Sequence, residues 1–149
     1  MVTTLTEALS LNLKNYGSTT LDREDLARGV EPDSCFYIQN ADRVQGLNWA
    51  TATDPPRALA LEVAITSAST RRMAVHKQLG IPEAWRYTKK GLAISELQNR
   101  EYIECEFSPT FTMVSPAVMA QFLQLREMTD DNAVIRAWRT WVREQVNQE

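Results

Sequence analysis

Residue types that usually build metal centres and disulfide frameworks are scarce in this chain of 149 residues. It has one histidine, His76, and two cysteines, Cys35 and Cys105, which lie far apart and outside any CxxC spacing. A histidine-based metal site needs more imidazoles, and a zinc cluster or disulfide framework needs more thiols at closer spacing. The sequence therefore argues against these three kinds of site.

Long apolar runs and an excess of positive charge are also missing. No run approaches the roughly 18 apolar residues of a membrane-spanning helix, and the first residues lack the features of a signal peptide. The net charge of −3 excludes an overall basic nucleic-acid binder but leaves room for a local basic face. We find no GxSxG, phosphate-cradling or dinucleotide motif. We expect a cytoplasmic protein with no membrane segment and no organic cofactor.

What the sequence does contain is the pattern of one folded α/β (α+β) domain over residues 1–149. Hydrophobic residues make up 44% of the chain, enough for a core. Apolar spacing and turn residues predict a helix over 5–16, strands over 34–40 and 59–65, a helix over 69–79, strands over 83–87, 92–97 and 102–107, and helices from 116 and from about 130. This order predicts a mixed central sheet flanked by helices.

The last predicted helix has an aromatic face. Val134, Trp138 and Trp141 are spaced by four and three residues, which places all three on one side of a helix. Such a stripe is an aggregation liability when exposed. We expect it to pack in the core or in a dimer contact.

Glu62 is the first candidate for a functional residue, because it lies in the middle of the apolar strand LALEVAI. Burying an unpaired carboxylate costs several kcal/mol, so a metal ion, a cation or water must compensate. Its same-face neighbours, Ala60 and Ala64, are small and leave room beside it. The alternative is a solvent-facing glutamate on a half-exposed strand, and spacing alone does not decide between the two.

Asp33 is the second candidate, at the start of the preceding strand and just after Pro32. Two carboxylates on neighbouring strands can share one divalent ion such as Mg²⁺ or Mn²⁺, which prefers oxygen ligands. On its own, the Pro32-Asp33-Ser34 stretch is more typical of a simple turn.

Two phrases together resemble a large bacterial family of uncharacterised, restriction-endonuclease-like proteins, placed in the PD-(D/E)XK nuclease superfamily. They are GVEPDSCFYIQN (29–40) and DPPRALALEVAITSASTRRMAVHKQLGIPEAWRY (54–87). The likeness extends upstream through NYGSTTLDREDLARG and downstream into RAWRTWV, so it covers most of the chain. It implies a restriction-endonuclease-like core and metal-dependent hydrolysis of DNA.

The resemblance also implies roles for single residues. Asp33 and Glu62 would bind the metal, with the backbone carbonyl of Val63 as a further ligand. The lysine that usually follows the glutamate by two residues is replaced by Ala64, and the matching displaced position is Arg72. Arg72 keeps the positive charge for a phosphate, but an arginine is a poor general base because it does not readily lose a proton.

Other positions depart from the family pattern. Ala58 stands where relatives often carry an acid, and we expect the N-terminal strand segment of longer relatives to be missing, with Glu7 as a weak substitute for its acid. Arg71, Arg72, His76 and Lys77 form a basic patch on a predicted helix, which is more typical of a solvated helix face than of a phosphate contact. His76 alone could shuttle protons, but a lone surface histidine is the commoner situation.

Three functions stay open on these observations. The first is a metal-dependent DNA endonuclease, using Mg²⁺ or Mn²⁺, with Asp33, Glu62 and Arg72 as its catalytic residues. The second is a catalytically impaired member that binds nucleic acid or protein. The third is a dimerising module, for which the tryptophan-rich helix is the motive, and we expect a homodimer.

Overall fold

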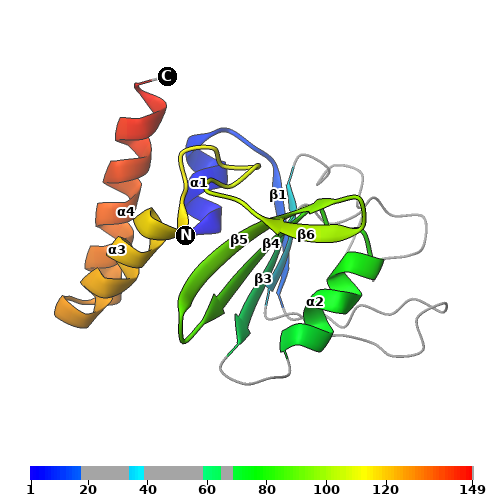
Figure 1. Ribbon diagram of the computed structural model, residues 1–149. Helices are drawn as coiled ribbons and strands as arrows, with labels where there is room; N and C mark the ends of the chain where they lie inside the picture. Colours follow the sequence, from blue (N-terminus) through cyan, green and yellow to red (C-terminus); the bar gives the residue numbers. More distant parts are fainter. Residues whose placement is uncertain (18–33, 39–58, 65–68, 149) are drawn as a thin grey trace.

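The computed structural model describes residues 1–17, 34–38, 59–64 and 69–148 (Figure 1). The helices are α1 (Val2–Ala8), α2 (Ser69–Gln78), α3 (Pro116–Met128) and α4 (Asp131–Val146). The strands are β1 (Leu13–Gly17), β2 (Ser34–Ile38), β3 (Leu59–Ala64), β4 (Glu83–Thr88), β5 (Gly91–Gln98) and β6 (Glu101–Glu104). None of these helices is long and apolar enough to cross a membrane.

The six strands form one sheet in chain order, from β1 to β6. Strands β3 and β4 are parallel, and the other neighbouring pairs are antiparallel. A parallel pair requires a crossover connection, and α2 lies within the one that joins β3 to β4. The predicted fold class, a mixed sheet flanked by helices, is confirmed.

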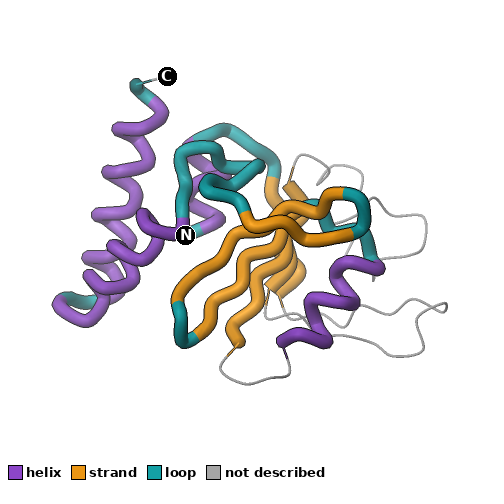
Figure 2. Tube along the Cα trace, viewed as in Figure 1, coloured by secondary structure: helices purple, strands orange, loops and turns teal. Residues whose placement is uncertain are grey.

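Helices cover both faces of the sheet, and the two layers differ in character (Figure 2). Helices α1, α3 and α4 lie on one side and α2 on the other. The main core lies under the first group; its large members include Leu5, Phe36, Trp85, Phe111 and Trp138. A much smaller apolar cluster, Ala60 and Ile81 with Leu79, lies beside α2. Among the described residues, the α2 side of the sheet therefore has little apolar material, and polar side chains fill part of it.

The helix predicted over residues 5–16 is wrong in its second half. Helix α1 ends at Ala8, Ser10 takes a positive φ of 54°, and residues 13–17 form β1 along β2. Leu5, Leu9 and Leu13 still pack on the same core, so their four-residue spacing reflects a common buried side and not one continuous helix. Residues 13–17 gain backbone hydrogen bonds to β2, where a continued helix would have left the sheet edge unpaired.

The predicted ends of the later helices are confirmed in detail. The Ser115 side chain accepts a hydrogen bond from the Val118 backbone N–H, and Pro116 follows it in the first turn of α3. Asp130 caps α4 in the same way by accepting from Ala133 N–H. Gly80, just after α2, has a φ of 68°, a conformation that suits glycine.

The aromatic face of α4 packs inside the chain, as predicted. Trp138 is fully buried and stacks on Trp141 with ring centroids 5.0 Å apart. Phe122 of α3 meets Trp138 edge-on at 4.9 Å, and Trp138 Nε1 donates to the Met1 carbonyl oxygen. Residues from both ends of the described chain thus meet around one indole ring.

A candidate active site at Glu62

The carboxylate of Glu62 lies inside the protein, on the α2 side of strand β3. Side chains alternate along a strand, so Leu59 and Leu61 face the main core while Ala60 and Glu62 face α2. Glu62 is completely buried. Of the two readings left open by the sequence, a solvent-facing glutamate is therefore wrong.

Helix α2 supplies two partners for this carboxylate. Arg72 Nη1 donates to Glu62 Oε2 over 3.1 Å, and His76 Nε2 lies 2.6 Å from Glu62 Oε1. Arg72 and His76 are four residues apart, so both point from the same side of the helix. One turn of α2 therefore holds both oxygens of the carboxylate at once.

His76 is buried, which corrects the expectation of a lone surface histidine. Its side chain is fully enclosed, and its Nδ1 atom has no hydrogen-bond partner among the described residues. The expectation that the basic patch is a solvated helix face is also wrong in part. Arg71 is exposed and Lys77 pairs with Glu101, whereas Arg72 and His76 turn inward.

Strand β4 brings a further cation next to Glu62. The parallel register places Arg86 directly beside Glu62, and neighbouring residues in register share one face of the sheet. Arg86 is partly buried. Three basic side chains, Arg72, His76 and Arg86, thus come from α2 and β4 to the surroundings of one buried acid.

The structure brings together some of the predicted site residues and not others. Glu62 and Arg72 are in contact, and the Val63 side chain, which follows Glu62, points away and is 43% exposed. Asp33 lies outside the described residues, so its sharing of a cation with Glu62 stays a prediction. Glu7 lies on α1, on the opposite side of the sheet from α2, and does not join Glu62.

Sequence reasoning missed His76 and Arg86 as members of this site. The spacing of Arg72 and His76 was a usable signal, because any helix face that presents Arg72 also presents the residue four positions later. Arg86 had no comparable signal. Its place beside Glu62 depends on the parallel register of two strands separated by a helix.

Comparison with known proteins agrees with this fold. The family model described as "Uma2: Putative restriction endonuclease" matches residues 2–126. The chain belongs to the Uma2 family. The match includes the β3–α2–β4 unit around Glu62, whereas helix α4 lies beyond it.

A solved structure extends the fold comparison for this Uma2 protein. It is the crystal structure of a putative nuclease belonging to DUF820 from Anabaena variabilis ATCC 29413, with a TM-score of 0.52 and 10% identity. The match covers 78% of this chain and 73% of that one. No curated protein matches the sequence. The two chains share a fold, and the restriction-endonuclease-like resemblance is confirmed at the level of the family.

Proposed function

We propose that this Uma2 protein is a metal-dependent DNA endonuclease in which Glu62 is a metal-binding carboxylate. The observation behind the proposal is the fully buried Glu62 on the central strand β3, held between Arg72 and His76. Domains rarely bury a carboxylate on a sheet without a reason, because burial costs several kcal/mol and must be compensated. Buried charged clusters of this kind are typical of functional sites.

The residues present fit a divalent ion in part. A carboxylate has about four lone-pair positions, and Glu62 uses two of them for Arg72 and His76. It can therefore still offer oxygen to Mg²⁺ or Mn²⁺, which prefer such ligands. The described residues form no cluster of three or more acidic, histidine or cysteine side chains that could hold a metal ion. The proposed ligand set thus needs Asp33 and the Val63 carbonyl besides Glu62.

The roles of the chain's own residues follow from their positions. A bound divalent ion would polarise the phosphodiester and favour attack by water. Arg72 would hold the scissile phosphate, since its side chain is 36% exposed while it contacts Glu62. His76 would fix the orientation of the Glu62 carboxylate from the buried side. Arginine supplies charge and donors but no base, so the PD-(D/E)XK site is altered at this point.

One observation favours a second candidate function, a catalytically impaired member that binds DNA or protein. Both oxygens of Glu62 already accept hydrogen bonds from cationic or titratable side chains, and the carboxylate is closed to solvent. An acid that is compensated in this way needs no metal ion. The two candidates differ in whether Glu62 binds a metal.

Metal titration and plasmid cleavage together separate the candidates. Calorimetry with Mn²⁺ should show binding that is lost in Glu62→Gln and weakened in Asp33→Ala, and nicking of supercoiled plasmid should follow the same order. Glu104→Gln, at an exposed carboxylate of β6, is the matched control and should change neither. Wild-type protein that binds DNA but neither binds Mn²⁺ nor cleaves would establish the impaired binder. Cleavage unchanged in Glu62→Gln would show a contaminating nuclease.

The homodimer stays a prediction of the sequence. Trp138, which motivated it in part, is buried within one chain, so a dimer contact must use other surfaces. Sedimentation at micromolar protein concentration tests self-association directly.

A further inference from the structure

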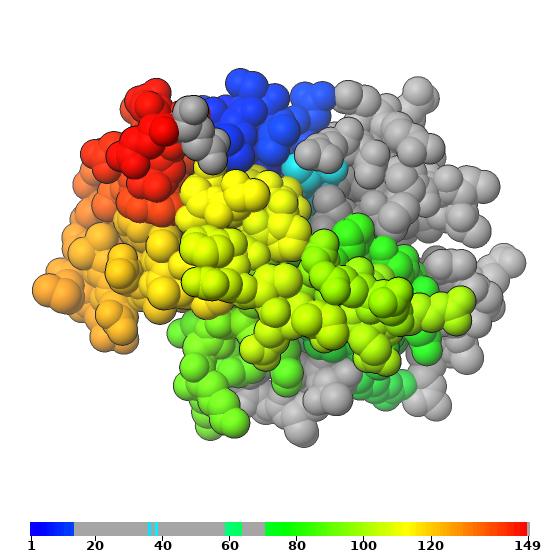
Figure 3. Space-filling view, turned by 45° about the horizontal axis from the view of Figure 1, so that its top comes forward, coloured from blue at the N-terminus to red at the C-terminus, as the bar shows by residue number. Residues whose placement is uncertain are grey.

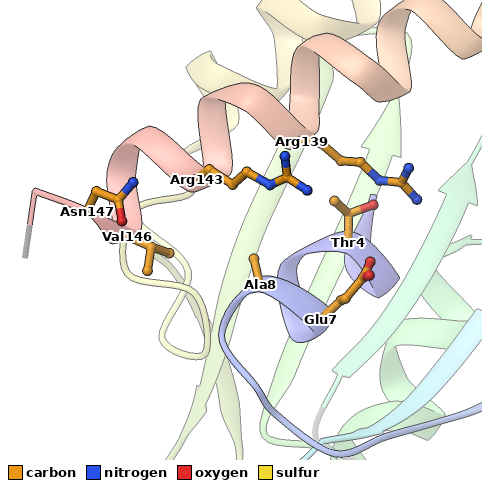
Figure 4. Close-up of a pocket in the computed structure, with 7 residues that line it drawn as sticks. All are labelled: Thr4, Glu7, Ala8, Arg139, Arg143, Val146 and Asn147. Atoms are coloured by element: carbon orange, nitrogen blue, oxygen red, sulfur yellow. The ribbon is translucent and has the colours of Figure 1, made fainter.

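A polar pocket lies between α1 and α4, on the side of the sheet opposite Glu62 (Figure 1). It has a volume of about 450 Å³, and its walls carry Arg139 and Arg143 of α4 with Thr4 and Glu7 of α1 (Figure 4). The end of α4 and the start of the chain lie on one face of the molecule (Figure 3). The pocket is thus built by two segments that are distant in sequence, and one of them, α4, is outside the Uma2 match.

The two arginines of this pocket make no polar side-chain contact with the described residues. Within the described part of the chain, neither Arg139 nor Arg143 has an ion pair or a hydrogen bond from its side chain, whereas Arg72 pairs with Glu62 and Arg126 with Asp131. They are four residues apart on α4, so their side chains lie on the same side of the helix. Both side chains extend from α4 over α1, where Thr4 and Glu7 lie (Figure 4).

The remaining walls give the pocket a mixed character. Thr4 and Asn147 add a hydroxyl and an amide, and Ala8 and Val146 add apolar surface. Among the lining residues that the structure describes, Glu7 is the one acid, so the two arginines leave one positive charge in excess in this set. An anion is therefore favoured near the arginines, and a hydrogen-bond donor near Glu7.

We propose that this pocket binds a phosphate monoester. Arg139 and Arg143 would hold the phosphate, because guanidinium groups match phosphate oxygens with paired donors. Thr4 and Asn147 would add neutral donors, and Glu7 would accept from a hydroxyl or amino group of the same ligand. The pocket volume of about 450 Å³ lies in the range of about 300–1,000 Å³ typical for small molecules. The inference is independent of the proposed nuclease function, because the pocket is on the other face of the sheet.

The phosphate monoester has two possible sources, a free nucleotide or the phosphorylated end of a nucleic-acid strand. Calorimetric titration with AMP and with a short single-stranded DNA carrying a 5′-phosphate distinguishes them. Adenosine and the same strand with a 5′-hydroxyl are the controls. Binding of AMP identifies a free nucleotide, and binding of the phosphorylated strand alone identifies a strand end; either result supports the pocket.

Variants of α4 locate the binding. Arg139→Gln and Arg143→Gln should each lower the affinity about three- to tenfold, and the double variant about ten- to hundredfold, since each removes a solvent-exposed, charge-assisted contact. Arg136→Gln is the matched control, because Arg136 is an exposed arginine of the same helix that does not line the pocket. Its affinity should stay within about twofold of wild type.

Glu7→Gln gives a test of opposite sign. Removing the Glu7 carboxylate should raise phosphate affinity about two- to fivefold, since it removes a nearby like charge. The proposal is overturned if neither ligand binds, if the double arginine variant binds as wild type does, or if Arg136→Gln weakens binding as much as Arg143→Gln. Melting temperatures of all variants should match, and the Glu7→Gln result still decides the matter if the double variant fails to fold.

Discussion

Two neighbouring strands each bury a glutamate, and the two carboxylates are treated in different ways. Glu83 of β4 faces the main core and accepts from Trp85 Nε1 at 2.6 Å, Ser108 Oγ at 2.5 Å, and both the backbone N–H and the hydroxyl of Thr110 at 3.0 and 2.5 Å. Glu62 of β3 faces α2 and is held by Arg72 and His76. One acid has only neutral partners, and the other has only basic ones.

The difference predicts a different role for each carboxylate. Four donors use all of the roughly four lone-pair positions of Glu83, so that acid is saturated and fixes the segment around Ser108 and Thr110 against β4. Glu62 has lone-pair positions left, and its two partners are the basic side chains Arg72 and His76. We therefore expect Glu83 to act as a structural anchor, and the contrast supports the proposed chemical role of Glu62.

The largest effect should come from Glu83→Ala. The change leaves the donors of Trp85 and Ser108 buried without an acceptor and opens a void. We therefore expect the free energy of unfolding to fall by about 4–6 kcal/mol. Urea denaturation measures the loss. The same midpoint as wild type would contradict the anchoring role and remove the contrast with Glu62.

Trp138→Ala should lower the free energy of unfolding by about 3–5 kcal/mol, the usual range for a fully buried aromatic ring. It touches neither glutamate, so it serves as a control for stability alone. Any DNA binding or cleavage by its folded fraction should equal that of wild type. A melting temperature equal to wild type would refute the packing of α4 through this ring.

Variants of His76 test how much the contact with Glu62 contributes to stability. His76→Ala removes a donor from a buried carboxylate and should cost about 2–4 kcal/mol, whereas His76→Gln keeps a donor amide and should cost about 1 kcal/mol or less. Thermal unfolding of both variants gives the two values. If both variants lower the free energy of unfolding by the same amount, the hydrogen bond to Glu62 contributes nothing beyond packing.

Arg72 should matter more for activity than for the fold. Arg72→Ala should lower any cleavage rate by about one to three orders of magnitude, the range for a charge contact in the transition state, and Arg72→Lys should match or raise it. Rates on supercoiled plasmid at fixed Mn²⁺ decide this. Equal rates and equal salt dependence for all three proteins would exclude Arg72 from the site.

The smallest effect is expected at Lys77, which joins α2 to Glu101 of β6 at the surface. Exposed ion pairs contribute about 0–1 kcal/mol, so Lys77→Ala should shift the unfolding free energy by less than about 1 kcal/mol. Chemical denaturation of Lys77→Ala and His76→Ala, measured under the same conditions, tests this. A larger loss at Lys77 would mean that the surface pair, not Glu62, holds α2 to the sheet.

Glu62 could be found from the sequence because its surroundings are local. The six residues of β3 are enough to show an acid in an apolar strand with a small residue two positions away on each side. The family resemblance added Arg72 on the next helix. The role of His76 was harder to see, since α2 is mostly polar and the sequence does not show which of its faces meets the sheet.

Glu83 and β1 show where the sequence could not suffice. Two of the three partner residues of Glu83, Ser108 and Thr110, lie 25 and 27 residues further along on a segment without regular structure, and no periodic pattern links them to Glu83. Leu13 continues the four-residue spacing of Leu5 and Leu9, which fits a helix equally well, and only the pairing of residues 13–17 with β2 decides for a strand. In both cases contacts distant in sequence override the local preference.

The bonds around Glu62 close short loops, since its partners are 10 and 14 residues away. The bond from Trp138 to the Met1 carbonyl spans 137 residues. Closing a longer loop costs more chain entropy, and contacts close in sequence tend to form faster. We therefore expect the β3–α2–β4 unit to assemble early as the chain leaves the ribosome, and α4 to dock last. Weakening α4 should then speed unfolding while leaving the folding rate almost unchanged.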